Sequence, residues 1–345
     1  MKSIREFSLN DQRVLVRCDF NVPVDGKGNI LDDFRIKQTI PTIKYLLDQK
    51  AKVVLMSHLG EPEGKVVESL KMDRVAEKLV ELLGVEVIKE NNCIGPEIEG
   101  HTNNIKPNQI VLLENLRFHK EETENNLEFA KQLSFLGDIY INDAFGVCHR
   151  PHASVVGITG YLESGAGFLL EKEISNLDKL MKNPEKPMVA LIGGKKVETK
   201  SKFIENISEV ADFVIISGLI KKEVTEKNIQ FKHAEKIIGP IDSLDSLDID
   251  EKTIQMFCEK ILQAKTVLWN GPFGKFEDKK YEAGTLALAK AIVDSNAFSV
   301  VGGGETVEFI SKQGMLDKFS HVSTGGGAML SYLSGETLPG LEGLK

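Results

Sequence analysis

Arginine and histidine residues in the first half of the chain follow short apolar runs. The polar residues at these run ends are Arg17, Asp19, Asn21, Ser57, His58, Arg117, His119, Asn142, Asp143, His149, Arg150 and His152. A further arginine, Arg35, lies in the first turn of an expected helix. Arginine binds phosphate and carboxylate groups bidentately, so this set suits a compact anion that carries both. A lone arginine at a strand end is more often a surface residue, but several together favour a site.

Glycines follow the apolar runs of the second half. They are Gly193, Gly194, Gly218, Gly271, Gly274, Gly302, Gly303, Gly304, Gly325, Gly326 and Gly327. Glycine between a strand and a helix lets an anion approach bare backbone N–H groups, and a nucleotide polyphosphate is the usual ligand. One glycine pair alone is more often a tight turn or a helix cap. A basic cleft together with a glycine cleft predicts phosphoryl transfer between two bound anions.

The lysines of the segment GGKKVETK depart from the usual charge pattern of helices. Positive charge is disfavoured at a helix N-terminus, by roughly 0.3–1 kcal/mol per charge. Yet Lys195, Lys196 and Lys200 lie in the first turns of an expected helix. Lys196 and Lys200 are four residues apart and so share a face. A solvated, lysine-rich helix start is the simpler alternative. We favour a bound anion, since such local violations tend to mark functional sites.

The elements that must position these residues alternate along the chain. Strands are expected at residues 14–20, 52–60, 110–118, 138–146, 187–194, 212–218, 265–272, 298–304 and 321–327, and helices at 32–49, 71–84, 195–207, 282–295 and 305–314. Continuous apolar strands alternating with helices predict parallel βαβ units covered on both faces. The fold class is therefore α/β, with two doubly wound domains joined by a helix within 167–187. Ligands of such sheets bind beyond the carboxyl ends of the strands. Residues 221–260 are the least regular, with a strand expected only at 235–240.

Composition narrows the class of protein. The chain has 345 residues and a formal charge of −8, which argues against a general nucleic-acid or membrane-surface binder. Aromatic residues are 7% of the total, too few for stacking single-stranded nucleic acid. No signal peptide and no apolar run of about 18 residues is visible. The cysteines lack CxxC spacing, which is typical of a reduced cytoplasmic protein: Cys18, Cys93, Cys148 and Cys258.

Long motifs in the chain resemble those of the phosphoglycerate kinase family, in family order. They are VLVRCDFNVP, SHLGEP, LLENLRFH, INDAFGVCHRPHASVVG, GFLLEKE, IGGKKVETK, TVLWNGPFGKFE, VVGGGET and HVSTGGGA. The resemblance implies two Rossmann-like lobes joined by a helix and hinge. It implies a phosphoglycerate-binding domain at residues 1–170, to which a tail at 332–345 returns, and a nucleotide-binding domain at 171–331. It also suggests a monomer.

The resemblance assigns a role to each matching residue. The N-terminal lobe would bind 3-phosphoglycerate or 1,3-bisphosphoglycerate through Arg17, Asp19, Asn21, Arg35, His58, Arg117 and Arg150. The C-terminal lobe would bind Mg-ADP or Mg-ATP through Lys196, Lys200, Asn270, Glu277, Gly303, Gly304, Glu305 and Thr306. Glu305 would approach the Mg²⁺ ion. From the chemistry of the transfer itself, we expect Arg35, Lys196 and the backbone of Gly326 to neutralise charge on the transferring group. The attacking atom would be a nucleotide phosphate oxygen or a carboxylate oxygen. Both are already ionised, so no general base is needed.

The chain departs from the family pattern at three places. The family motif SHLGRP has an arginine where this chain has Glu61, which places an acid in the basic site. The glycine-rich segment after the second strand of the C-terminal lobe is reduced to SGLI, and the material missing between Ile220 and Thr266 belongs to the adenine side. The metal-proximal aspartate is Glu305, and Lys195 adds a charge near the phosphates.

The sequence is also compatible with two alternatives to an active phosphoglycerate kinase. The shortened lobe and Glu61 would also suit a catalytically weak or inactive relative that serves as a sensor or scaffold. A kinase acting on another small carboxylate or phosphate acceptor is a third hypothesis, and the otherwise complete arginine and histidine set counts against it.

Overall fold

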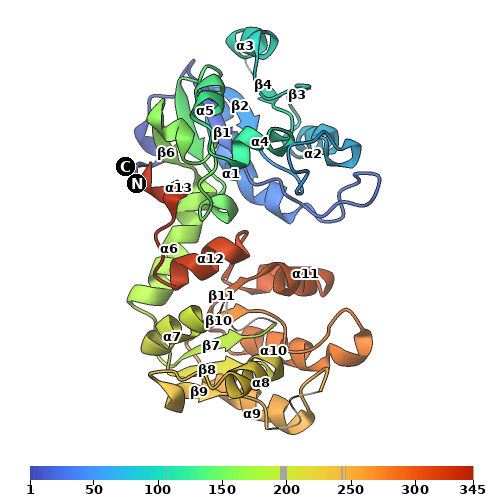
Figure 1. Ribbon diagram of the computed structural model, residues 1–345, viewed down its shortest axis with the longest axis vertical. Helices are drawn as coiled ribbons and strands as arrows, with labels where there is room; N and C mark the ends of the chain where they lie inside the picture. The colour runs from blue at the N-terminus through green and yellow to red at the C-terminus, as the bar shows by residue number, and fades with distance from the viewer. Residues whose placement is uncertain (107, 195–199, 242–243, 245, 345) are drawn as a thin grey trace. The chain divides into compact units, whose positions relative to one another are not determined.

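The structure is a computed structural model that describes residues 1–106, 108–194, 200–241, 244 and 246–344. The chain divides into two compact units. Unit 1 comprises Met1–Glu173 and Thr337–Lys345, and unit 2 comprises Ile174–Glu336. Each unit contains a six-stranded sheet in which every strand pairing is parallel (Figure 1). The predicted α/β class with two doubly wound parallel sheets is confirmed.

The sheet of unit 1 has the strand order β3-β4-β2-β1-β5-β6. Its strands are β1 (Arg13–Arg17), β2 (Lys52–Met56), β3 (Glu86–Lys89), β4 (Gln109–Leu112), β5 (Ile139–Asn142) and β6 (Glu163–Ala166). Its helices are α1 (Phe34–Asp48), α2 (Asp73–Leu83), α3 (Pro96–Asn103), α4 (Lys120–Thr123), α5 (Leu127–Ser134) and α13 (Pro339–Glu342). Helix α6 (Phe168–Lys182) begins in unit 1 and continues into unit 2.

The sheet of unit 2 has the strand order β12-β11-β10-β7-β8-β9. Its strands are β7 (Met188–Ile192), β8 (Phe213–Ile216), β9 (Ile237–Ile238), β10 (Thr266–Asn270), β11 (Phe298–Gly302) and β12 (His321–Val322). Its helices, besides the end of α6, are α7 (Ser201–Val210), α8 (Gly218–Glu226), α9 (Glu251–Leu262), α10 (Ala283–Asp294), α11 (Gly304–Lys312) and α12 (Gly326–Leu333).

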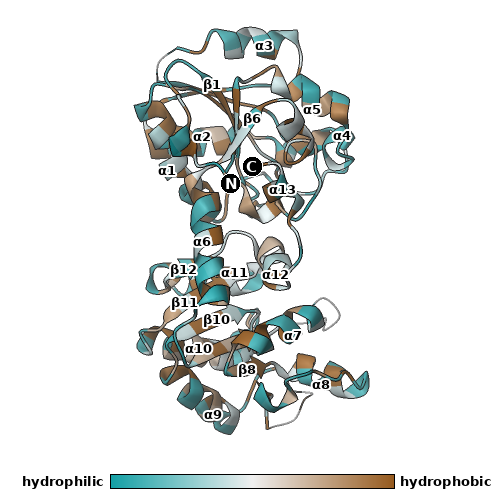
Figure 2. Cartoon of the chain, turned by 90° about the vertical axis from the view of Figure 1, so that its left-hand side faces the viewer, coloured by the Kyte–Doolittle hydropathy of each residue, from teal (hydrophilic) through white to brown (hydrophobic). Residues whose placement is uncertain are grey.

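The central strands form because both of their faces are covered. All five residues of β7 and of β10 are buried, as are four of the five in β1. The helices bury one face each. In α2 the buried residues are Val75, Ala76 and Leu79, and Gly84 ends the helix at a φ of 68°. Figure 2 shows the same pattern in α9, which has hydrophilic and hydrophobic sides.

The strand orders reverse at β1 and β5 in unit 1, and at β7 and β10 in unit 2. At such switch points the connections leave the sheet to opposite faces and open a crevice at the carboxyl ends of the strands. A ligand site is therefore expected at the residues that follow β1 in unit 1 and β7 in unit 2.

The sequence-based prediction was incomplete at several places, and the short helices α3, α4, α5, α12 and α13 are among the elements that it did not include. Strands β3 and β6 were not expected. Residues 221–260, expected to be irregular, hold most of α9 and most of α8. Helix α9 begins at a capped residue, since the Asp250 side chain accepts a hydrogen bond from Thr253 N. This cap and a buried face around Phe257 make the segment helical.

The two chain termini lie side by side in unit 1 (Figure 1), where Lys2 N donates to Leu344 O at 3.1 Å. The tail also donates from Gly340 N to Cys148 O at 2.9 Å. Within the part of the chain that the structure describes, no helix combines the length and apolarity needed to cross a bilayer.

Candidate active site

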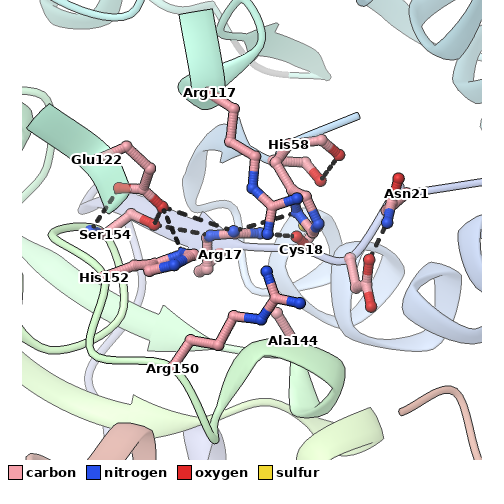
Figure 3. A network of polar contacts seen from close by, with 12 residues as sticks. Arg17, Cys18, Asn21, His58, Arg117, Glu122, Ala144, Arg150, His152 and Ser154 are labelled. Atoms are coloured by element: carbon pink, nitrogen blue, oxygen red, sulfur yellow. Dashed lines mark hydrogen bonds and ion pairs between the residues drawn. The ribbon is translucent and has the colours of Figure 1, made fainter. Parts of the chain in front are cut away.

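Arg17 is the centre of a polar network in unit 1 (Figure 3). It ends β1 and its side chain is fully buried. Its Nε donates to Ser154 Oγ at 2.8 Å, one terminal nitrogen donates to Cys18 O, and the other lies 3.2 Å from His58 Nδ1. A buried guanidinium is tolerated only when its donors are satisfied, so this network fixes Arg17 rigidly.

Glu122 supplies the countercharge to Arg17. Both side chains are fully buried, and Glu122 Oε1 lies 3.7 Å from an Arg17 terminal nitrogen. Glu122 also accepts from Ser154 Oγ at 2.6 Å and Ser154 N at 2.9 Å. The carboxylate therefore holds the Arg17 guanidinium through a shared serine as well as directly.

The histidines of this cluster are held neutral. Burial, followed by the charges of Arg17, Arg117 and Arg35, lowers the pKa of His58 well below its usual value. Burial, followed by Arg17, Arg117 and Arg150, lowers the pKa of His152 to about 3. A neutral His58 can accept a hydrogen bond from Arg17 and adds no further charge.

Arg35 lies at the edge of the cluster, in the first turn of α1. Its terminal nitrogen donates to Asn21 O at 2.9 Å and lies 3.4 Å from the buried Asp19 carboxylate. The Asn21 side chain accepts from Gly60 N at 2.9 Å, which ties this edge to the loop after β2. Arg35 keeps 29% of its side chain exposed, so it is positioned and still reachable by a ligand.

Arg117 and Arg150 approach the centre from two other loops, and Figure 3 shows their guanidiniums pointing toward it. Arg117 lies in a short 3-10 helix after β4, Leu116–Phe118, and its terminal nitrogen donates to Gly60 O at 2.8 Å. That nitrogen lies 2.7 Å from Glu61 Oε1, and an Arg150 terminal nitrogen lies 3.3 Å from the same oxygen. Glu61, the acid that departs from the family motif, thus contacts both arginines.

The site of unit 2 is built from backbone. The loops after β7 and β10 interlock, because Gly193 N donates to Asn270 O at 2.8 Å and Gly194 N donates to Pro272 O at 2.9 Å. A Cβ at Gly193 would collide with the carbonyl oxygens of Gly271 and Pro272. Gly271 and Gly194 have φ values of 96° and 79°. Glycine is therefore required here by close approach and by backbone conformation.

Lys200 is buried at the N-terminus of α7, with 8% of its surface exposed. Its amine donates to Gly193 O. Burial lowers the pKa of Lys200 to about 8, although Glu305 acts in the opposite direction. A buried amine with a depressed pKa beside glycine loops is arranged to meet an anion. Lys195 and Lys196 lie outside the residues that the structure describes.

The N-termini of α11 and α12 lie next to each other. Gly303, with a φ of 98°, precedes α11, and a Cβ at Gly326, the first residue of α12, would lie 2.8 Å from Gly303 Cα. Asn270 Nδ2 is buried beside Gly303 without a hydrogen-bond partner in the described part of the chain. Thr306 has another role, since its hydroxyl accepts from Gly271 N at 2.8 Å and holds the β10 loop.

A cavity of about 360 Å³ opens beside these loops. Its lining includes several residues discussed above: Gly194, Gly218, Pro272, Gly274, Glu277 and Glu305. Its apolar lining comes from Leu219, Pro240, Leu244, Leu247, Ile249 and Phe273. Much of this wall belongs to the segment between Ile220 and Thr266, where the sequence predicts that material is missing. The shortened lobe therefore still encloses a pocket of a size and composition suited to a small ligand.

The structure gathers the predicted acceptor residues in one cluster of unit 1, where some are in direct contact and others are linked through Gly60 and Glu61. The predicted nucleotide residues that the structure describes lie in and beside the glycine loops of unit 2 and the cavity next to them. Lys196 alone among the predicted nucleotide residues is not described. Sequence reasoning missed Glu122 and Ser154, which anchor Arg17. Glu122 lies in the run KEETEN, which looks like a solvated helix, and no signal in the sequence singles it out.

Comparison with known proteins agrees with this arrangement. Residues 4–227 and 220–336 match the family model described as phosphoglycerate kinase. Phosphoglycerate kinases of Moorella thermoacetica and Dictyoglomus turgidum are 41% and 42% identical, with alignments that cover 99% of this chain and 98% of each relative. The Moorella alignment extends over 387 positions, so that relative has residues with no counterpart among the 345 here.

Solved structures give the same result. Phosphoglycerate kinase from Pyrococcus horikoshii OT3 superposes with a TM-score of 0.88 at 32% identity, covering 100% of this chain and 98% of that one. The Coxiella burnetii structure gives 0.84 at 35% identity, covering 99% and 98%. The chain belongs to the phosphoglycerate kinase family, the glycolytic phosphotransferases that use a carboxyl group as acceptor.

Proposed function

We propose that unit 1 binds 3-phosphoglycerate or 1,3-bisphosphoglycerate and that unit 2 binds Mg-ATP or Mg-ADP. The contrast between the two switch points carries this proposal. The crevice after β1 presents guanidiniums, which bind phosphate and carboxylate together. The crevice after β7 presents glycine backbone, a buried lysine and helix N-termini, which suit a polyphosphate.

In the ATP-forming direction, a β-phosphate oxygen of ADP attacks the acyl phosphate of 1,3-bisphosphoglycerate. A bond forms between that oxygen and phosphorus, and the bond from phosphorus to the carboxyl oxygen breaks. The leaving group departs as the carboxylate of 3-phosphoglycerate. The attacking oxygen is already ionised, so no general base is needed, and the low pKa of His58 is consistent with its not acting as one.

Catalysis then consists of positioning and neutralising charge. Arg35, reachable and held by Asn21 and Asp19, is our candidate in unit 1. Lys196 and the Gly326 N–H at the start of α12 are the candidates in unit 2. Lys200, Asn270, Gly303, Gly304, Glu277 and Thr306 would form or support the nucleotide site.

The residues present fit a Mg²⁺ ion that arrives on the nucleotide. The described residues contain no cluster of three or more potential metal ligands. Mg²⁺ is commonly held by one or two carboxylates plus substrate phosphates, and Glu305, at the cavity beside Gly194, can supply one. Bound there, Mg²⁺ would neutralise phosphate charge.

We further propose that the protein is a cytoplasmic monomer.

A coupled kinase assay with ATP and with GTP tests the proposal. The wild-type chain should show Mg-dependent turnover with 3-phosphoglycerate. Arg35→Ala and Lys196→Ala should each lower kcat by about 10²- to 10³-fold, with a much smaller change in affinity, because they stabilise charge that develops during transfer. Near-normal turnover in either variant would remove that residue's catalytic role. Calorimetric binding of one ligand without turnover would instead favour a sensor or scaffold.

A further inference from the structure

Glu61 is placed where a bound phosphate group is expected. Its carboxylate Oε1 lies 2.7 Å from Arg117 and 3.3 Å from Arg150, so one oxygen is shared by two guanidiniums. The two arginines differ in exposure, because the side chain of Arg150 is 42% exposed and that of Arg117 only 3%, whereas Arg17 is fully buried and already paired with Glu122. Arg150, the most exposed arginine of the cluster, and its buried neighbour Arg117 are therefore both engaged by the protein's own carboxylate.

The backbone around Glu61 is fixed. Gly60 has a φ of 65°, and a Cβ there would lie 2.8 Å from the Leu70 side chain. Gly60 N donates to Asn21 Oδ1, Gly60 O accepts from Arg117, and Gly64 N donates to Arg117 O at 3.1 Å. Pro62 further restricts the backbone of Glu61. The contact with the arginines is thus set by the loop.

The side chain of Glu61 can nevertheless leave. It is 64% exposed, so its carboxylate can rotate into water without a large desolvation cost. The arginines have other anchors, since Arg117 donates to Gly60 O and Arg150 Nε lies 3.3 Å from His149 Nε2. Loss of Glu61 therefore leaves both guanidiniums placed but open. Burial lowers the pKa of Arg117, and Glu61 opposes that effect, as a neutralising partner does.

We propose that Glu61 is a displaceable internal anion that occupies Arg117 and Arg150 in the free protein and thereby sets the affinity of the site for its acceptor. The inference rests on the proposed function, because it takes the phosphate of phosphoglycerate as the group that displaces the carboxylate. A phosphate group carries up to two negative charges and offers more oxygens, so it can engage both guanidiniums bidentately where Glu61 offers one oxygen.

The proposal predicts that Glu61→Gln tightens binding. Calorimetry with 3-phosphoglycerate should give a Kd about three- to tenfold lower than wild type, the size expected for removing exposed competing ion pairs. The KM for 3-phosphoglycerate should fall by a similar factor, with kcat changed less than about twofold. Glu63→Gln is the matched control. It is exposed in the same loop, removes the same charge and has no ion pair to either arginine among the described residues, so its Kd should stay near wild type.

A Kd for Glu61→Gln equal to or above the wild-type value would overturn the proposal, as would an equal tightening by Glu63→Gln. The wild-type assay separates this test from the proposed function. Tighter binding by Glu61→Gln without turnover in any protein would support the role of Glu61 and contradict the kinase proposal. Normal turnover with unchanged Kd values would overturn the role of Glu61 alone. No binding of 3-phosphoglycerate by either protein would contradict both.

Discussion

The two switch points of this molecule are built from different chemical groups. After β1, buried side chains are bonded to one another, with Arg17, Glu122 and Ser154 at the centre. After β7, glycines bring two loops so close that no side chain fits between them. The first site carries full charges that need partners even without a ligand. The second consists mainly of backbone groups, with one buried amine, that of Lys200, which donates to Gly193 O.

Because of this difference, substitutions should affect the two sites in different ways. A buried ion pair whose partner is removed leaves a charge in a medium of low polarity, so changes in unit 1 should reach the stability of the fold. In the glycine loops, substitution of a glycine that has free space beside it should change ligand affinity more than the stability of the fold.

Arg17→Met should destabilise unit 1 by about 3–5 kcal/mol, because Glu122 stays buried and unpaired. Trp269 is the single tryptophan and lies in unit 2, so its fluorescence follows that unit, whereas circular dichroism follows both. In urea, we expect an early transition in circular dichroism that the fluorescence does not share. Lys200→Met, the matched change in unit 2, should cost less than about 1 kcal/mol, since burial already disfavours that ammonium. Equal losses in both variants would erase the contrast.

Unit 1 should also lose stability in mild acid. The unfolded chain protonates His152 below about pH 6.5, whereas the folded protein does not until about pH 3. The unfolded state therefore binds more protons between these values, and the free energy of unfolding falls as pH falls, by up to about 1 kcal/mol per pH unit. Urea unfolding at pH 6.5 and 5.5 measures this slope, and His152→Gln should reduce it. A slope unaffected by the substitution would show that His152 is not held neutral.

Gly304→Ala should have the smallest effect on stability. Gly304 begins α11, and a Cβ at this position would meet no atom within 4 Å, so alanine should be neutral or stabilising by up to about 0.5 kcal/mol. Its KM for Mg-ATP should nevertheless rise severalfold, because the methyl group obstructs the approach of phosphate. Gly100→Ala in α3 is the control, with equal free space and no expected change in KM. An unchanged KM for Gly304→Ala would remove Gly304 from the nucleotide site.

The buried strands and their ends could be predicted from the sequence. Where continuous apolar runs such as those of β1 and β7 alternate with helices, they are strands of a parallel sheet. The residues that follow such strands must lie together at one edge of the sheet. Arg17, His58 and the glycine loops could therefore be placed at the carboxyl ends of the strands without knowledge of any contact.

Strands β3 and β6 could not be predicted, because their own residues do not require them to be strands. β3 is Glu-Val-Ile-Lys and only partly buried. β6 is Glu-Ser-Gly-Ala, and tertiary contacts make it a strand: Ala166 N donates to Lys2 O, and a Cβ at Gly165 would strike Phe7. Small residues are needed there by packing that only the fold reveals.

The partners of the site arginines were equally hidden. Glu122 belongs to an acidic run, and only folding shows that it turns inward to Ser154 and Arg17. Glu61 was visible as an unusual acid, but its shared contact with Arg117 and Arg150 depends on three separate loops. The location of these residues at the strand ends could be predicted from the sequence, whereas their pairings could not.

Hydrogen exchange with one ligand at a time would show whether the two anions bind to different units. With 3-phosphoglycerate alone, protection should appear in unit 1, in the loops around His58, Arg117 and Arg150. With Mg-ADP alone, it should appear in unit 2, around Gly193 and Gly303. Protection of the unit 2 loops by 3-phosphoglycerate, or of the unit 1 loops by Mg-ADP, would contradict the division of the two anions between the two sheets.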